Sequence, residues 1–511
     1  MSRPSFYVTT PIYYANAPLH VGSAFEIIGI DALARYRRLC GDDVFFLTGL
    51  DEHGEKNQRA AEERGMAPQQ HVDEMAASFL DFCRRLEVSV DDVIRTTEPR
   101  HKRVVEIFWR KVRDRGDICL GEYSGFYCSR CESYVREAEL KEGHCPACGD
   151  ATRTLSEPAY FFRLSKYQDA LKSLFVEHPE FAQPSFRRAE MLQIIESGLE
   201  DVCVSRSSIH WGIPVPDAPG HVIYVWFDAL VNYISALGYQ GDDGRFQRYW
   251  PATLHVVGKD ILRWHTILWP AMLMSAGLPL PRKVFGHGFI NVRGAKMSKS
   301  LGNVVDPREI ASKYGADALR YFLMRETPYE NDGSYSEDNL LDRYNADLAD
   351  QLGNLVFRTL SMLERYFGGI IPDPGSEPRG ALAEAAASLF QDVDACMAEL
   401  QFSRALERIW EFVRRANQYV EERKPWSQAK DPAQRPALAA TLYHLAEAAR
   451  ILSLLIEPTM PASALAIRRQ LGIAEENRAL AEALTWGGLK PGTKIRRGQP
   501  LFPKKETSQE K

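Results

Sequence analysis

The N-terminal segment alternates between patterns typical of strands and of a helix. Residues 5–10 (SFYVTT) and 43–47 (DVFFL) are runs of β-branched, aromatic and aliphatic residues, which favour buried strands. Between them a helical pattern begins at Pro18, continues to about Leu39 and ends at Gly41. This order of strand, helix and strand predicts a parallel βαβ unit.

A second α/β stretch follows later in the chain. The run TLHVVG predicts a strand that ends at Gly258, and the helix expected after it is rich in Trp and Leu. About a hundred residues separate this stretch from the first, and they contain two closely spaced pairs of cysteines.

Helical spacing dominates the remainder of the chain. Asp306, Pro307 and Glu309 are the N-cap, first-turn proline and capping-box acid of a helix that extends to Gly315. The C-terminal tail is basic and contains prolines, and this composition predicts an extended or poorly ordered segment. From about residue 339 to residue 471 apolar stripes predict a helical bundle; two of the stripes are Leu406, Ile409, Trp410 and Val413, and Leu442, Leu445 and Ala449.

Composition narrows the class of protein. The 511 residues are 45% hydrophobic and 26% charged, which is typical of a globular chain of about three domains. The net charge of −5 argues against a uniformly basic nucleic-acid coat but allows a local basic face. We find no signal-peptide pattern and no apolar run near the ~20 residues of a membrane span, so we expect a cytoplasmic protein without a membrane partner.

The cysteines indicate a metal rather than a disulfide framework. The chain has nine, an odd number, and the spacing Cys128-x2-Cys131-x13-Cys145-x2-Cys148 offers four thiolates. Four protein ligands suit one structural, tetrahedral Zn²⁺ with no open position. The adjacent His144 could replace one of them. Four unliganded thiols, or a zinc ribbon that binds nucleic acid, are the alternatives.

The motif His20-Val21-Gly22-Ser23 is a candidate anion site. His20 is expected in the first helical turn, where unpaired N–H groups and the helix dipole attract anions. Ser23 shares its face, and Gly22 leaves room for a ring or a phosphate near the backbone. Alone, the motif also fits an ordinary surface histidine.

A second motif, Lys296-Met297-Ser298-Lys299-Ser300, lies between two glycines. It supplies positive charge on a loop, as a triphosphate needs when negative charge moves onto leaving pyrophosphate. Alone, it also fits a solvated basic loop.

These two motifs carry a family resemblance. PIYYANAPLHVGS followed by GAKMSKSLGN resembles the two signatures of class I aminoacyl-tRNA synthetases. LTGLDEHGE, YVWFDALVNY and VVGKDILRWHTILWPAML resemble the methionyl-tRNA synthetase family, and the resemblance runs from about Ser5 to Lys505. It implies a Rossmann-type α/β catalytic domain split by a zinc-binding insertion, then an all-α anticodon-binding bundle.

The resemblance also implies domain boundaries. We expect the first catalytic half at 1–117, the insertion with the zinc knuckle at 118–225, and the second catalytic half with the KMSKS loop at 226–300. A stem-contact linker at 301–345, the anticodon-binding domain at 346–488 and the basic tail at 489–511 complete the chain.

The family's functional residues transfer to matching positions. Gly258 would let a nucleotide approach, and Asp260 would accept hydrogen bonds from ribose. Catalysis is assigned to His20, Ser23, Lys296 and Lys299. ATP binding is assigned to Gly22, Glu26, Gly258, Asp260, Lys296, Ser298 and Lys299.

The resemblance further implies an amino-acid pocket for methionine, whose thioether packs well on aromatic rings. Asp51 suits the substrate ammonium group, and Tyr14 and His265 could bond near the sulfur. Leu230 stands where some branches of the family have proline. The residues assigned to the pocket are Ile12, Tyr14, Asp51, Trp226, Ala229, Leu230, Tyr233, Ile261, His265 and Trp269.

The bundle would read the CAU anticodon. Asn354 and Arg358 share one helix face, and Trp426 offers a stacking surface.

The reaction implied is that of a methionine–tRNA ligase. L-Methionine and ATP, with Mg²⁺ on the phosphates, give methionyl-adenylate and pyrophosphate, and the methionyl group then passes to the 3′ end of tRNA(Met) for initiation and elongation. The methionine carboxylate is the nucleophile, so alignment and charge stabilisation suffice.

Two alternatives remain. One is a class I synthetase for valine, isoleucine, leucine or cysteine. The first three normally carry a long editing insertion, and cysteine enzymes hold zinc in the pocket. The other is a tRNA-binding relative without catalysis. The retention of His20, Asp51 and both motif lysines argues against it.

The chain ends near LFPKKE without the dimerisation domain of some relatives, so we expect a monomer.

Overall fold

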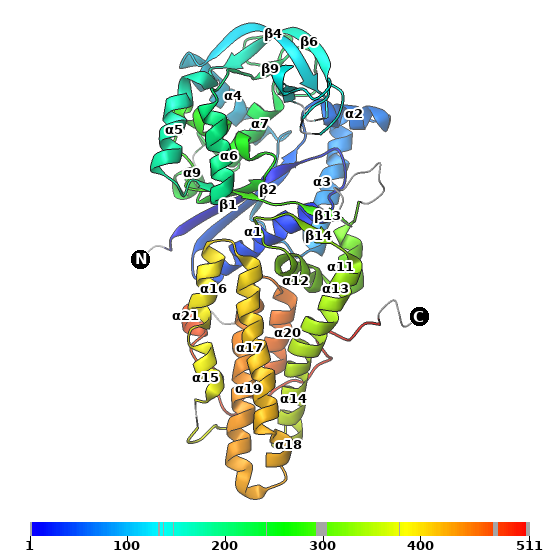
Figure 1. Ribbon diagram of the computed structural model, residues 1–511, viewed down its shortest axis with the longest axis vertical. Coiled ribbons are helices and arrows are strands. Elements are labelled where there is room, and N and C mark those ends of the chain that lie inside the picture. Colours follow the sequence, from blue (N-terminus) through cyan, green and yellow to red (C-terminus); the bar gives the residue numbers. More distant parts are fainter. Residues whose placement is uncertain are drawn as a thin grey trace.

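A parallel sheet lies in the middle of the molecule, between a smaller antiparallel sheet and a helical bundle (Figure 1). The computed structural model describes residues 3–130, 133–135, 137–146, 148–241, 243–292, 304–377, 379–473 and 479–506. Within these ranges the parallel sheet has six strands in the order β3-β2-β1-β11-β12-β7. They are β1 (Ser5–Tyr14), β2 (Asp43–Asp51), β3 (Asp92–Arg95), β7 (Ala182–Gln183), β11 (Leu254–Gly258) and β12 (Val284–His287).

The predicted βαβ unit is confirmed, with one correction. β1 and β2 pair in parallel and are longer than predicted, ending at Tyr14 and Asp51. The helix between them, α1 (Val21–Leu39), begins at Val21 rather than Pro18. His20 has extended backbone (φ −124°, ψ 179°), and its Nδ1 accepts a hydrogen bond from the Gly22 amide at 3.1 Å. His20 is therefore the N-cap of α1, not a first-turn residue.

The two faces of the parallel sheet belong to different apolar cores. Val8 of β1 lies in a core that continues through α1 and into the bundle, whereas its neighbour Tyr7 lies in a core with Phe108 and Trp109. This alternation follows from the two-residue repeat of a strand. The helices of the first α/β stretch are α1, α2 (Glu55–Glu63), α3 (Pro68–Arg85) and α4 (Pro99–Asp114).

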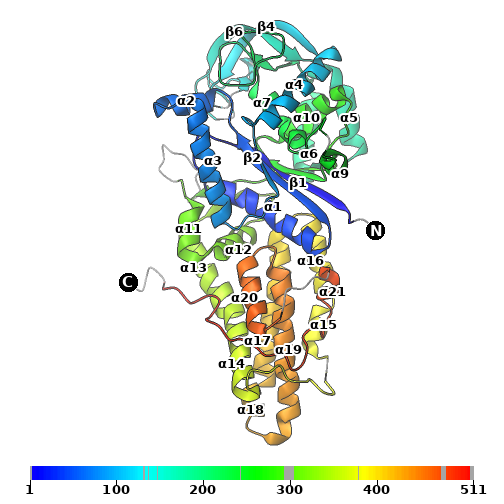
Figure 2. The same cartoon turned by 180° about the vertical axis from the view of Figure 1, so that it is seen from behind.

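The segment between the two α/β stretches forms its own antiparallel sheet. Its described strands are ordered β5-β4-β6-β8 and lie at the end of the molecule remote from the bundle (Figures 1 and 2). The edge strand β7 comes from the same segment but pairs with β12 of the parallel sheet. The elements are β4 (Ile118–Cys128), β5 (Ser133–Val135), β6 (Arg153–Phe162), α5 (Gln168–Glu177), α6 (Ser185–Glu196), β8 (Val202–Cys203), β9 (Ser205–Arg206) and β10 (Val222–Ile223).

The second α/β stretch contains the predicted strand at TLHVVG, now β11, which ends at Gly258. The expected helix at 306–315 is also confirmed, because the Asp306 carboxylate caps it by accepting from the Arg308 amide at 2.8 Å. The other elements are α7 (Val225–Leu230), α8 (Asn232–Ser235), α9 (Arg245–Tyr249), a π-helical turn (Trp264–Leu268), α10 (Trp269–Ala276), β13 (Ile290–Val292), α11 (Pro307–Tyr314), α12 (Ala316–Glu326) and β14 (Gly333–Tyr335).

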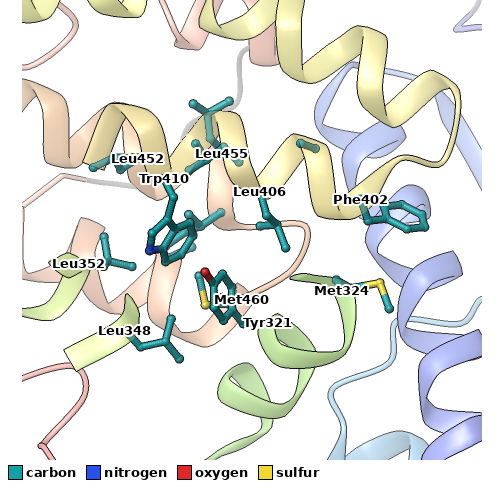
Figure 3. Close-up of a cluster of buried hydrophobic side chains, with 14 of the residues drawn as sticks. Tyr321, Met324, Leu348, Leu352, Phe402, Leu406, Trp410, Leu452, Leu455 and Met460 are labelled. Carbon is teal, nitrogen blue, oxygen red and sulfur yellow. The ribbon is translucent and has the colours of Figure 1, made fainter. Parts of the chain in front are cut away.

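The C-terminal helices form the predicted bundle. Leu406 and Trp410 of one stripe pack on Leu452, Leu455 and residues from neighbouring helices (Figure 3). The bundle consists of α13 (Glu337–Arg343), a π-helical segment (Tyr344–Gly353), α14 (Asn354–Phe367), α15 (Ala381–Ala386), α16 (Leu389–Ala398), α17 (Phe402–Arg423), α18 (Pro425–Gln428), α19 (Arg435–Ile456), α20 (Pro461–Leu471) and α21 (Leu480–Ala483).

Two expectations about the C-terminal half need correction. The described segment Pro432–Ile456 is long and apolar enough to cross a membrane, contrary to our reading of the apolar runs, but its apolar window is entirely buried in the structure. The tail is extended, as expected, and most of its described residues are exposed, but single buried side chains anchor it to the bundle. Phe502 is buried, and Lys505 and Asn345 exchange two hydrogen bonds of 2.9 and 3.0 Å.

Arg320 of α12 joins the bundle to the α/β part of the molecule. Its guanidinium is fully buried, pairs with Asp31 of α1 at 2.6 Å and donates to the Thr459 carbonyl at 2.8 Å. A buried charge with these partners fixes the relative position of α1 and the α19–α20 corner.

Candidate active site

A cavity of about 350 Å³ opens where β1 and β11 lie side by side. Strand order reverses at this point, so crossover connections leave in opposite directions and a crevice forms at the carboxyl ends of the strands. Every described residue assigned to catalysis, ATP or methionine lines the cavity except Trp269. These lining residues are Ile12, Tyr14, His20, Gly22, Ser23, Glu26, Asp51, Trp226, Ala229, Leu230, Tyr233, Gly258, Asp260, Ile261 and His265.

The cap position gives His20 a defined protonation state. Because its Nδ1 accepts the Gly22 amide proton, the ring proton must reside on Nε2. Burial lowers the pKa of His20, which favours this neutral form. Ser23 follows within the first turn of α1 and also faces the cavity. The N-terminus of α1 thus presents a hydrogen-bond donor to anything that occupies the cavity.

Glu26 is held by a residue that the sequence patterns did not identify. Its Oε2 lies 2.6 Å from Nε2 of His287, and both side chains are buried. Burial by itself would lower the pKa of His287, but the Glu26 carboxylate raises it above its ordinary value. His287 is the last residue of β12, just as Gly258 is the last residue of β11. Functional residues of such sheets gather at the carboxyl ends of the strands, and this rule could have located His287.

The ends of β2 and β11 carry the other polar groups. Asp51 is the last residue of β2, and its carbonyl accepts from the Ala15 amide at 3.0 Å and from Nδ2 of Asn57 at 2.9 Å. A Cβ at Gly258 would lie 2.8 Å from Oδ1 of Asp260, so a larger residue there would displace the Asp260 side chain. Glycine therefore keeps the Asp260 carboxylate at the cavity wall.

The apolar wall is built from two short helices and a π-helical turn. The two helices are α7, which ends at Leu230, and α8, which starts at Asn232. Trp226 stacks on Trp264 with ring centroids 4.8 Å apart. Trp269 is fully buried behind the wall, where its ring lies 6.1 Å from that of Tyr233. It therefore supports the wall from behind.

His265 has a fixed tautomer. Its Nδ1 lies 3.0 Å from the Ile261 carbonyl, which only accepts, so Nδ1 carries the proton. Nε2 then accepts the hydroxyl proton of Tyr233 at 2.7 Å. Burial lowers the pKa of His265 to about 4, so the ring is neutral at physiological pH.

Three cysteine thiols converge in the antiparallel region. The sulfur atoms of Cys128, Cys145 and Cys148 all lie within 4.8 Å of one another. Tetrahedral Zn–S bonds of about 2.3 Å place sulfurs about 3.8 Å apart, so this cluster fits a thiophilic metal. Cys131 lies outside the described residues. Among the described residues, His144 is not part of the cysteine cluster. Its Nδ1 forms a hydrogen bond of 2.8 Å with the Glu142 carbonyl.

Two of the three residues assigned to the anticodon, Arg358 and Trp426, are in contact at one side of the bundle. Asn354 is exposed at the start of α14, and the Arg358 guanidinium lies over the Trp426 ring at 5.7 Å. Arg358 also pairs with Glu421 at 2.9 Å. α18, which carries Trp426, is near the end of the bundle remote from the parallel sheet (Figure 1). Lys296, Ser298 and Lys299 lie outside the described residues.

Comparison with known proteins defines the class. The family model "tRNA synthetases class I (M)" matches residues 6–157 and 149–360, and "Anticodon-binding domain of tRNA ligase" matches residues 381–480. The structure of Mycobacterium tuberculosis methionyl-tRNA synthetase in complex with methionyl-adenylate is 42% identical, with a TM-score of 0.95 over 98% of this chain and 100% of that one. Fold and cavity are thus those of a class I aminoacyl-tRNA synthetase.

Sequence relatives narrow the class further. The methionine–tRNA ligase of Caldanaerobacter subterraneus subsp. tengcongensis is 50% identical over 99% of this chain and 80% of its own length. That of Thermotoga maritima is 45% identical over 98% of this chain and 80% of its own length. The chain therefore belongs to the methionine–tRNA ligase family.

Proposed function

We propose that this protein activates L-methionine with ATP and transfers it to tRNA(Met). One observation carries the proposal: residues from distant parts of the chain that were assigned to ATP and methionine line one cavity. The full-length likeness to a structure in complex with methionyl-adenylate supports it.

In the first step the substrates are aligned rather than covalently activated. Asp51 holds the methionine ammonium, and the wall of Trp226, Ala229 and Leu230 receives the thioether. A carboxylate oxygen of methionine attacks the α-phosphorus of ATP. The bond from that phosphorus to the bridging oxygen breaks, and pyrophosphate leaves with the electron pair.

Charge stabilisation comes from the N-terminus of α1 and from the KMSKS loop. The Nε2–H of His20 donates to a phosphate oxygen, while Lys296 and Lys299 neutralise the leaving pyrophosphate. Mg²⁺ binds the phosphate oxygens when ATP is present. Gly258 and Asp260 receive the ribose.

In the second step a ribose hydroxyl of the terminal tRNA adenosine attacks the acyl carbon, and AMP leaves. Asn354, Arg358 and Trp426 read the CAU anticodon at the far end of the bundle. Recognition of the tRNA and activation of the amino acid thus use separate surfaces. We place the reaction in the cytoplasm.

We further propose that Cys128, Cys131, Cys145 and Cys148 hold one structural Zn²⁺. The metal stabilises the insertion and takes no part in the reaction. Metal analysis of purified protein should give about one zinc per chain, and the Cys145→Ser variant should lose it. Reduced, folded protein without stoichiometric zinc would contradict this.

Amino-acid-dependent pyrophosphate exchange tests the main proposal. Methionine should support exchange, whereas valine, isoleucine, leucine and cysteine should not. Purified tRNA(Met) should then accept methionine, and a tRNA with a changed anticodon should not. Exchange with another amino acid would point to a different synthetase, and tRNA binding without exchange would indicate a non-catalytic relative.

A further inference from the structure

A buried carboxylate behind the methionine wall has no part in the mechanism above. Asp228 is in α7, the helix that also carries Trp226, Ala229 and Leu230. Its side chain is fully buried. Oδ2 lies 2.6 Å from Nδ1 of His53, and Oδ1 lies 2.7 Å from Nε2 of His101. Burial by itself would raise the pKa of Asp228, but the two imidazoles hold it at about 2.

The two imidazoles come from different elements. His53 lies in the loop between β2 and α2, two positions after Asp51 in the sequence. That loop is itself fixed, because the Asn57 side chain donates to the His53 carbonyl at 2.9 Å and Trp211 donates to the Glu52 carbonyl at 2.6 Å. His101 lies on α4, and its Nδ1 bonds the Ser235 hydroxyl of α8 at 2.8 Å. Asp228 thus connects three parts of the catalytic domain.

α7 depends on such anchors for its orientation. A helix of six residues closes only about two backbone hydrogen bonds, which is too few to hold it in place. Phe227 anchors one side by packing edge-on against Trp109, with ring centroids 5.1 Å apart. Asp228 anchors the helix to the loop that follows Asp51. The residues that face the cavity are therefore positioned by residues that face away from it.

We propose that Asp228 is a positioning residue that sets the distance between the ammonium-binding Asp51 and the apolar wall, and thereby helps to select methionine by length. The inference rests on the proposed function, because it assumes that Asp51 and the α7 wall bind the two ends of methionine. If the link is broken, the loop and the wall can shift relative to each other. Amino acids one methylene shorter or longer should then be discriminated less well.

The test compares two buried aspartates. Asp228→Asn keeps the shape of the side chain but replaces one acceptor oxygen with a donor, so one imidazole loses its partner. Asp117→Asn is the matched control: Asp117 is also fully buried and accepts from Lys166 at 2.5 Å, Tyr167 at 2.5 Å and Ser275 at 2.7 Å, but it is not among the described residues that line the cavity. KM and kcat for methionine, S-methylcysteine and ethionine are measured by pyrophosphate exchange.

For Asp228→Asn we expect the KM for methionine to rise about tenfold or more, with the KM for ATP changed less than about twofold. The preference for methionine over the shorter and longer analogues should fall about fivefold. Asp117→Asn should lower the melting temperature without changing either quantity. Equal effects of the two variants, or an unchanged KM and preference in Asp228→Asn, would overturn the proposal.

A second pair of variants covers the case in which Asp228→Asn does not fold. His53→Ala removes the link on the Asp51 side and leaves Asp228 bonded to His101, so the KM for methionine should rise. In His53→Asn the side-chain amide can donate near the position of Nδ1 and should restore most of the affinity. Equal KM values in both variants and the wild type would refute the positioning role. If the wild-type protein shows no methionine-dependent pyrophosphate exchange, the proposed function itself is wrong.

Discussion

The walls of the cavity and the core of the bundle differ in the length of their elements and in how much apolar packing contributes to them. Around the cavity, short elements are fixed by buried polar pairs between distant segments, such as His287 with Glu26 and His265 with Tyr233. In the bundle, long helices pack mainly through apolar stripes (Figure 3), with buried pairs such as Arg450 and Glu447 in addition. Among the residues assigned to tRNA, Asn354 is exposed and Arg358 and Trp426 are half-buried. A substitution near the cavity should therefore change the chemistry, whereas one at the surface of the bundle should change recognition alone.

The largest expected effects are at the groups proposed to stabilise developing charge. His20→Ala and Lys299→Ala should each slow adenylate formation by on the order of 100-fold or more, the scale for losing a preorganised donor to developing charge. Single-turnover assays at saturating methionine and ATP measure this, with folding checked by circular dichroism. A loss below tenfold in both would assign the stabilising role elsewhere.

At the bundle surface, Trp426→Ala should separate the two steps. Loss of base stacking costs about 1–3 kcal/mol, so tRNA charging should fall roughly 10- to 100-fold. Pyrophosphate exchange should stay near wild type, because α18 is remote from the cavity. Trp426 also packs partly on the apolar core, so a parallel loss of both activities and of thermal stability would identify it as a packing residue.

Ser23→Ala should give a smaller defect within the cavity. A serine hydroxyl is shorter than an imidazole and cannot become cationic, so it can donate only one modest hydrogen bond to a phosphate. We expect a loss of about tenfold or less in adenylate formation, the size of one net hydrogen bond. A defect as large as that of Lys299→Ala would show that Ser23 carries part of the charge stabilisation.

The smallest effect concerns pH. His265 has a pKa of about 4 in the folded protein and an ordinary value of 6.5 when unfolded, so the unfolded chain binds the extra proton first as pH falls. Its contribution to stability is therefore complete above pH 6.5 and declines below it. The KM for methionine should change less than about twofold between pH 8 and 6, because the neutral ring persists. A steep rise across this range that His265→Gln abolishes would contradict the assigned tautomer.

Features that repeat along the chain could be predicted from the sequence. Strands β1 and β11, the Asp306 cap and the stripes around Trp410 follow from local periodicity and capping chemistry, which need no distant partner. Most of the cavity residues were instead assigned through the resemblance to the methionyl-tRNA synthetase family, because their residue types and spacing alone also fit an ordinary core or turn. Periodicity and residue type are properties of short segments, so one sequence is sufficient to show them.

Tertiary structure alone decided which distant residues meet. The pairing of Glu26 with His287 spans 261 positions and that of His53 with Asp228 spans 175, and no spacing rule connects such residues. The same holds for the placement of Trp269 behind the wall and for the break between α7 and α8. Long-range packing fixes these features, because the free energy of burying a polar group depends on the partner that the fold brings to it.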